Sequence, residues 1–350
     1  MEIEQHIWGA TSDGEVVVLY TLRNDRGAEV QLCNIGASII SVKVPDREGH
    51  LADVALGYRD FKSYFSDPAH CGKSIGRVAG CIAYGVMTVE GEEYRLEVNS
   101  GAGHLDGGVK GLADRLWESR VETNRVVMSI YSEEGDSGYP GGLQVEVAFD
   151  FDEENTLEIT YVAQSDRTTP VNLTDYLYLN LGGDASGSTL DHQLRLNASR
   201  LLETDDRGIP TGALLDVADT AVDFRTSRRL GDGMESDFAR IRMLRGYEHF
   251  FPLDGWRPNI LTEVGELRDE RSGRKVEIFS SQPGAMLYTG NRLAGGCPVN
   301  KSGGRYRDHD GVVVACMGYP DAVNYPEFPS VLLEPGRLYV QKTVYRFGTF

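Results

Sequence analysis

The sequence predicts an all-β protein, a large antiparallel β-sandwich that residues 1–350 form as a single domain. Apolar and polar residues alternate with period two over long stretches such as Leu143–Phe151, which is typical of strands buried on one face. The chain contains 41 glycines and 13 prolines, which predicts many turns between short elements. Helical spacing is confined to two short segments, 60–66 and 226–230. Strands of this kind bury their apolar faces by packing one sheet against another.

The clearest element is a hairpin near the middle of the chain. After Leu143–Phe151 come the turn-like residues 152–155, and Leu157, Ile159 and Tyr161 then share one face of a second strand. The same pattern predicts further strands at Glu15–Leu22, Glu29–Val44, Arg125–Tyr131, Lys275–Ser280 and Ala285–Tyr288.

Composition and charge narrow the classes of partner. The formal net charge is −18, from 35 basic and 53 acidic residues that are spread along the chain. Such a surface repels a phosphate backbone, so we expect no nucleic-acid partner, and solubility is the simplest interpretation of the charge. No run approaches the roughly 20 apolar residues of a membrane span. With nucleic acid and membrane excluded, we expect a small-molecule substrate. We also expect the protein to be a monomer or a homodimer.

The cysteines and the N-terminus predict a cytoplasmic protein. The five cysteines are odd in number, scattered and without a Cys-x-x-Cys pair, which favours reduced thiols over disulfides or a zinc site. The acidic segment 1–6 contains no apolar signal-peptide region. Zinc-protease, dinucleotide, Walker and serine-hydrolase motifs are absent, so no cofactor and no metal are expected.

Short motifs along the chain resemble one known family. The stretch Pro170–Leu181 reads Pro-Val-Asn-Leu-Thr-Asp-Tyr-Leu-Tyr-Leu-Asn-Leu. Other motifs in the same order are Asn34-Ile35-Gly36-Ala37, Gly76-Arg77-Val78-Ala79, Ile209-Pro210-Thr211-Gly212, Tyr288-Thr289-Gly290-Asn291 and Pro320-Asp321-Ala322. Together they resemble the aldose 1-epimerase (galactose mutarotase) family over nearly the entire chain. The resemblance implies a twisted galactose mutarotase-like β-supersandwich. It also implies a sugar cleft in which a glutamate and a histidine open and reclose the ring by general acid–base catalysis.

The same motifs place residues of a different kind at the family's functional positions. Tyr176 stands at the position of the acid histidine, and Ala315 stands at that of the base glutamate. Asp106 replaces a second histidine and Glu248 replaces an aspartate. The sugar-holding Asn-Arg pair and glutamine correspond to Gly80-Cys81 and to Met286. Because the surrounding glycines and prolines remain, the resemblance implies a cleft re-equipped for another ligand.

We hypothesise that Asp106 and Glu248 form an acid–base pair whose pKa values are separated by burial and mutual repulsion. Tyr176 would donate a hydrogen bond to a developing oxyanion. The remaining substrate-binding candidates are Asp175, Tyr178, His104, Cys81, Met286, Ala315, Met317, His249 and Arg77. Methionine and alanine at these positions favour a bulkier and less polar ligand than a free sugar.

Simpler roles compete with each assignment. Asp106 precedes Gly107-Gly108 and could cap a turn, and Glu248 could pair with a basic residue. Tyr178 could serve packing alone.

Three functions remain: a cofactor-independent isomerase or cyclase for a small, relatively apolar metabolite (a non-sugar or a modified sugar), a non-catalytic carbohydrate-binding or regulatory protein, and a residual aldose 1-epimerase with substituted acid and base groups. The apolar cleft favours the first, and Ala315 argues against the third.

Overall fold

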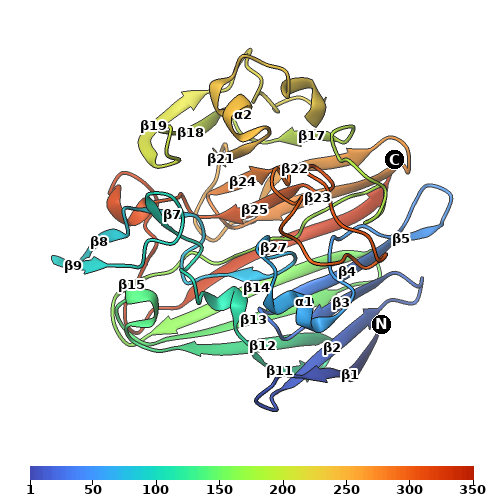
Figure 1. Cartoon of the computed structure of the whole chain (residues 1–350), viewed down its shortest axis with the longest axis horizontal. Helices are drawn as coiled ribbons and strands as arrows, with labels where there is room; N and C mark the ends of the chain where they lie inside the picture. Colours follow the sequence, from blue (N-terminus) through green and yellow to red (C-terminus); the bar gives the residue numbers. More distant parts are fainter.

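A computed structural model describes residues 1–350, and almost all of their regular structure is strand (Figure 1). The largest sheet is antiparallel, with the strand order β11 (Glu118–Glu122), β12 (Arg125–Ser132), β13 (Leu143–Phe151), β14 (Thr156–Ser165), β27 (Tyr339–Thr349), β23 (Arg274–Ser280), β22 (Thr262–Asp269), β17 (Gln193–Leu196) and β20 (Arg228–Arg229). A second sheet runs in chain order through β1 (Glu2–Ala10), β2 (Val16–Arg23), β3 (Glu29–Cys33), β4 (Ser38–Pro45) and β5 (Leu51–Asp53). A third contains β21 (Glu248–Pro252), β24 (Gly284–Tyr288) and β25 (Val313–Met317).

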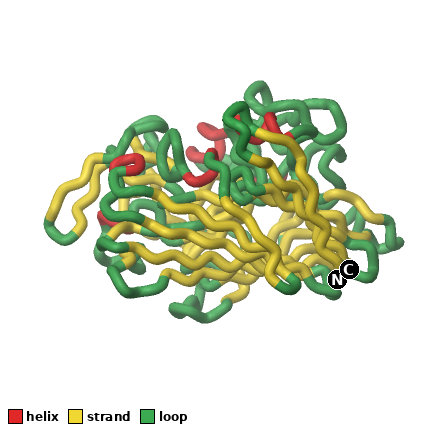
Figure 2. The backbone as a smooth tube through the Cα atoms, turned by 90° about the horizontal axis from the view of Figure 1, so that it is seen from below, coloured by secondary structure: helices red, strands yellow, loops and turns green.

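Shorter elements complete the chain. Five strand pairs are β6 (Ser74–Ile75) with β16 (Thr174–Asp175), β7 (Cys81–Ala83) with β10 (Gly103–Leu105), β8 (Val86–Val89) with β9 (Glu92–Arg95), β15 (Thr169–Pro170) with β26 (Leu332–Leu333), and β18 (Arg200–Thr204) with β19 (Pro210–Asp216). The helices are α1 (Phe61–Phe65) and α2 (Ala239–Leu244), with 3₁₀ turns at Leu112–Asp114, Asp136–Gly138, Leu230–Gly233 and Ala322–Asn324. Figure 2 shows the strands stacked in curved layers, with the helical segments lying in the connecting loops. Neither helix has the length and apolar character that a membrane crossing requires.

The predicted hairpin is confirmed. β13 and β14 pair from Leu143 opposite Ser165 to Phe151 opposite Leu157. The segment Glu29–Val44 is not one strand but two, because the chain turns at Gly36 and Ala37, whose φ angles are 60° and 45°. Helix α1 forms where helical spacing was found, and its N-terminus is capped by the Asp60 carboxylate. The helix expected at 226–230 is wrong, since those residues lead through β20 into a 3₁₀ turn.

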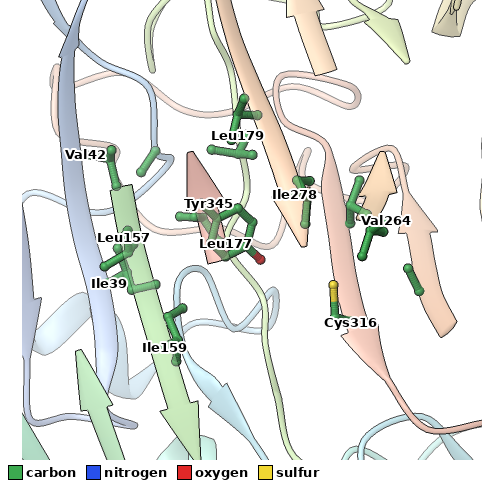
Figure 3. Close-up of a cluster of buried hydrophobic side chains, with 14 of the residues drawn as sticks. Ile39, Val42, Leu157, Ile159, Leu177, Leu179, Val264, Ile278, Cys316 and Tyr345 are labelled. Atoms are coloured by element: carbon green, nitrogen blue, oxygen red, sulfur yellow. The ribbon is translucent and has the colours of Figure 1, made fainter. Parts of the chain in front are cut away.

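Two large apolar clusters and a small third one lie between the elements. The main core joins the nine-stranded sheet to the inner faces of the other two, and Figure 3 shows Ile39, Leu157, Leu177 and Tyr345 within it. A second cluster lies on the opposite face of the smaller sheets, beneath the loops. Alternation along β25 divides the residues between the clusters: Val314 and Cys316 enter the core, whereas Val313, Ala315 and Met317 face the second cluster. The candidate site lies on this second face.

Candidate active site

A cavity of about 570 Å³ lies over the outer face of the three-stranded sheet. Its floor follows from strand register. Glu248 lies opposite Tyr288 on the next strand, and Tyr288 lies opposite Val313. The side chains of these three residues therefore form one row on the same face of the sheet. The next row, two residues along each strand, is Phe250, Met286 and Ala315. The floor therefore carries one carboxylate at its edge and is otherwise aromatic and aliphatic.

Tyr176 and Asp106 meet in the wall of this cavity. Tyr176 follows the short strand β16, which is held against β6. Its hydroxyl donates a hydrogen bond of 2.8 Å to Oδ1 of Asp106, 70 residues away in sequence. Burial raises the pKa of the Tyr176 phenol well above its ordinary value, and the adjacent Asp106 carboxylate raises it further. The phenol is therefore a neutral hydrogen-bond donor to Asp106.

A tight turn aims Asp106 into the cavity. Asp106 has a φ of 52°, and Gly107 follows with a φ of 85°. Gly107 must be glycine, because a Cβ there would lie 2.0 Å from the carbonyl oxygen of Gly76. Oδ1 also accepts the Gly80 amide at 2.8 Å, while Oδ2 has no hydrogen-bond partner in the protein. Asp106 thus joins distant segments and does not cap its own turn, and burial raises its pKa.

Glu248 pairs with a basic residue, as one of the simpler interpretations held. Its Oε2 accepts a hydrogen bond of 2.6 Å from Nη2 of Arg292. Burial raises the pKa of Glu248, the Arg292 and Arg240 cations oppose the rise, and the Asp106 charge adds to it. Asp106 and Glu248 are therefore electrostatically coupled across one cavity, although each has its own hydrogen-bond partner.

Five other predicted residues also line the cavity. Tyr178 does so while packing edge-on against Tyr288, with ring centres 6.1 Å apart. Burial raises the pKa of the Cys81 thiol to about 12, which leaves it un-ionised. Burial lowers the pKa of His249 to about 3, so its ring is neutral and packs against Phe238. Met286 and Ala315 belong to the floor already described.

Four predicted substrate-binding residues do not line the cavity, and these predictions are wrong in position. Asp175 faces the core, where Oδ1 accepts a hydrogen bond of 2.9 Å from the Tyr345 hydroxyl. Met317 is fully buried beyond the cavity floor. His104 is enclosed between the Glu97 carbonyl and the Tyr139 hydroxyl. Arg77 donates to four backbone carbonyls and to Ser132, so its guanidinium is a structural anchor whose pKa burial lowers to about 10.

The cavity also contains residues that the sequence analysis missed. Tyr288, Phe250 and Val313 lie two positions from Met286, Glu248 and Ala315, so strand alternation would have found them. His70 lies on a loop and Arg240 lies on the short helix α2, and neither carries a sequence pattern that predicts a place in the cavity. The His70 ring is 3.6 Å from Oδ2 of Asp114, and that carboxylate also binds the buried ammonium of Lys73 at 3.2 Å. No group of three or more His, Cys, Asp or Glu side chains is arranged to hold a metal ion.

The arrangement is a β-sandwich that carries a cavity lined by two carboxyl groups suited to acid–base chemistry. Comparison with known proteins gives the family. The aldose 1-epimerase family profile matches residues 18–346, and the chain belongs to this family. The galactose mutarotase of Bos taurus is 38% identical over 329 residues, which are 94% of this chain and 93% of that protein. The galactose mutarotase of Homo sapiens is 38% identical over 337 residues, 96% of each chain.

Solved structures agree with this family. The GalM/aldose epimerase homologue from C. elegans superposes with a TM-score of 0.86 at 29% identity, covering 94% of this chain and 98% of that one. The galactose 1-epimerase from Lactobacillus acidophilus NCFM gives a TM-score of 0.85 at 25% identity, covering 99% of each. The predicted family and the predicted galactose mutarotase-like fold are therefore confirmed.

Proposed function

We propose that this chain is a cofactor-independent isomerase or cyclase that opens or closes a ring by proton transfer in a small, relatively apolar metabolite. The substrate is a modified sugar or a non-sugar lactol (a cyclic hemiacetal). The observation that carries the proposal is the pair of coupled carboxyl groups, Asp106 and Glu248, that share one cavity and whose pKa values are both raised by burial. Groups of raised pKa in a cavity are typical of general acids and bases.

The contacts of each carboxyl group suggest its role. Arg292 binds Glu248 and favours its ionised form, so Glu248 is the base that accepts the proton of the lactol hydroxyl. Asp106, protonated on its free Oδ2, is the acid that donates a proton to the ring oxygen as the ring carbon–oxygen bond breaks. The product is a hydroxy-aldehyde. After rotation of the aldehyde, the reverse transfers reclose the ring and restore both groups.

Tyr176 acts on Asp106 in this scheme. Its hydroxyl is already used by Oδ1 of Asp106, so it orients the acid. The hydrogen bond to an oxyanion that the sequence suggested would require this contact to break. Tyr176 is accordingly proposed as a positioning residue.

The floor supports a ligand less polar than a free hexose. Phe250, Met286 and Ala315 offer no hydrogen bond that could hold a sugar hydroxyl. By the family resemblance, Met286 and Ala315 stand where a glutamine and the base glutamate would be. An apolar ring substituent packs well on such a surface, whereas a hydroxyl buried there would remain unsatisfied.

Residual aldose 1-epimerase activity is the second candidate. The observation in its favour is the 38% identity to galactose mutarotases over nearly the whole length. It requires Asp106, Tyr176 and Glu248 to replace the family's acid and base on a free sugar. We also propose that the protein works as a monomer or homodimer in the cytoplasm, a reducing compartment in which its five free cysteines stay reduced.

Anomer exchange in the wild-type protein tests the proposal. Polarimetry of freshly dissolved α-galactose and α-glucose measures sugar mutarotation, and NMR exchange spectroscopy measures anomer exchange in 6-alkyl-2-hydroxytetrahydropyrans. We expect exchange of the alkyl lactols well above the buffer rate and little effect on the sugars. Acceleration of the sugars alone would favour the second candidate. Binding without exchange of any compound would favour a non-catalytic binding protein and contradict the proposal.

A further inference from the structure

Arg240 is a partly buried cation in the cavity wall without an acidic partner. It lies on α2, and its Nη1 donates to the carbonyl oxygen of Asp205 at 3.2 Å. Nε is buried with no hydrogen-bond partner, and Nη2 has none in the protein. No carboxylate lies within 4.0 Å of this guanidinium, whereas the neighbouring Arg292 is bound to Glu248.

The backbone beside Arg240 leaves room for the guanidinium. Gly208 lines the cavity with a φ of 83°, and a Cβ at this position would lie 3.1 Å from Nη2 of Arg240. The turn therefore favours glycine both for its conformation and for the close approach of the planar group. The Asp205 carbonyl binds Nη1, and Gly208 lies beside Nη2, which has no hydrogen-bond partner in the protein.

An unpaired buried cation is costly, and proteins pair such groups with a counter-charge. Burial lowers the pKa of Arg240, which is the sign of that cost, while Glu248 and Asp205 act on it only from a distance. Nε is enclosed by protein, so the donor left for a ligand is Nη2, whose N–H groups can form a charge-assisted hydrogen bond to a carboxylate. The missing partner is therefore expected to come with the ligand.

We propose that Arg240 binds a carboxylate of the ligand, so that the substrate of this cavity is an amphipathic carboxylic acid. Its apolar body lies on Phe250, Met286 and Ala315, and its carboxylate reaches Arg240 at the wall. The inference rests on the proposed function only in taking this cavity as the substrate site.

Calorimetric titration of the wild-type protein with matched probes tests the inference without any turnover. The probes are 2-naphthoate and 4-phenylbutanoate, each compared with its uncharged primary amide, and acetate controls for ionic effects. We expect each acid to bind roughly ten- to a hundredfold more tightly than its amide, because hydrogen bonds to charged groups are worth about 1.5–3 kcal/mol. Equal affinity of acid and amide, or no binding of either acid, would overturn the inference.

Variants of Arg240 test whether this residue causes the preference for the acid over the amide. Arg240→Gln should remove the preference for the acid, and Arg240→Lys should keep only part of it, since an ammonium cannot reproduce the planar guanidinium that the Asp205 carbonyl and Gly208 position. Arg242→Gln is the matched control: Arg242 lies on the same helix, is exposed and pairs with Asp237. An acid preference that survives Arg240→Gln would overturn the assignment. Acid binding without lactol exchange would refute the proposed function alone, and lactol exchange without acid preference would refute the carboxylate site alone.

Discussion

The two faces of the segment Thr174–Tyr178 place similar groups in different surroundings. Tyr176 and Tyr178 face the cavity, whereas Asp175 faces the main core, where it binds Tyr345. Leu177 lies beside Tyr345 in that core (Figure 3). Each face contains a carboxyl group bound by a tyrosine hydroxyl: the partly buried Asp106 by Tyr176 at 2.8 Å, and the buried Asp175 by Tyr345 at 2.9 Å. Burial raises the pKa of both carboxyl groups.

The carboxyl groups of Asp106 and Asp175 differ in the surroundings of their second oxygen atom, Oδ2. Oδ2 of Asp175 is buried without any partner, so no ligand can reach it. Asp106 lines the cavity, and its Oδ2 is free for a ligand. A raised pKa therefore marks a candidate acid only where the group opens onto a cavity, and elsewhere it is a cost to stability.

Replacing Glu248 should have the largest effect on the cavity face. We expect Glu248→Gln to lower the rate of lactol exchange by about 10²–10⁴-fold, because an amide cannot accept the proton. NMR exchange spectroscopy measures the rate. Glu263→Gln, which also breaks a glutamate–arginine pair but at the surface, is the control and should retain the wild-type rate. Equal rates in the two variants would remove Glu248 from the mechanism.

On the core face, Asp175→Asn should change stability and not catalysis. The pKa of Asp175 in the folded protein is about 6, above its ordinary value of 3.8, because burial disfavours the charge. The folded state then binds the proton more tightly, so this residue lowers wild-type stability as pH rises from about 4 to about 6. The variant lacks this loss and should gain up to about 3 kcal/mol relative to wild type above pH 6.

Urea unfolding between pH 4 and pH 7.5 measures this gain. Asp237→Asn, at a fully exposed aspartate, should show no such trend. A stability difference between Asp175→Asn and wild type that does not vary with pH would mean that Asp175 is not protonated preferentially in the folded state.

Tyr176→Phe should have a smaller effect, because it removes only the hydrogen bond that orients Asp106. Loss of one hydrogen bond, worth about 1 kcal/mol, should slow exchange several-fold. The Tyr176 hydrogen bond also lowers the pKa of Asp106, so the variant should have a higher pKa there. Because the acid must be protonated, the loss of activity at high pH should move to higher pH. A pH–rate profile whose limbs stay fixed would separate Tyr176 from Asp106.

The sequence predicted the framework better than the site, for physical reasons. Period-two alternation reports directly which side of a strand is buried, and it located the hairpin of β13 and β14 correctly. It did not show that Glu29–Val44 turns, since the residues of that turn are as buried as those of a strand. The same alternation places the side chains of Asp175 and Tyr176 on opposite faces of the segment, so the sequence already indicated that Asp175 would not share the cavity with Tyr176.

Other parts of the site depend on contacts between distant segments. The pairing of Arg292 with Glu248, 44 residues apart, and the enclosure of Arg77 by Ser132 and backbone carbonyls follow from loop geometry. No local pattern encodes these contacts. Arg240 on α2 and His70 on a loop reach the cavity for the same reason, so the sequence could not show the one cation without an acidic partner in its wall.

The most direct test of the account is lactol exchange in Asp106→Asn compared with Asp175→Asn. Both variants remove a carboxylic acid that is bound by a tyrosine hydroxyl, and they differ in the face on which that acid lies. We predict a loss of about 10²–10⁴-fold for Asp106→Asn and a rate within about threefold of wild type for Asp175→Asn. A full exchange rate in folded Asp106→Asn protein would contradict it.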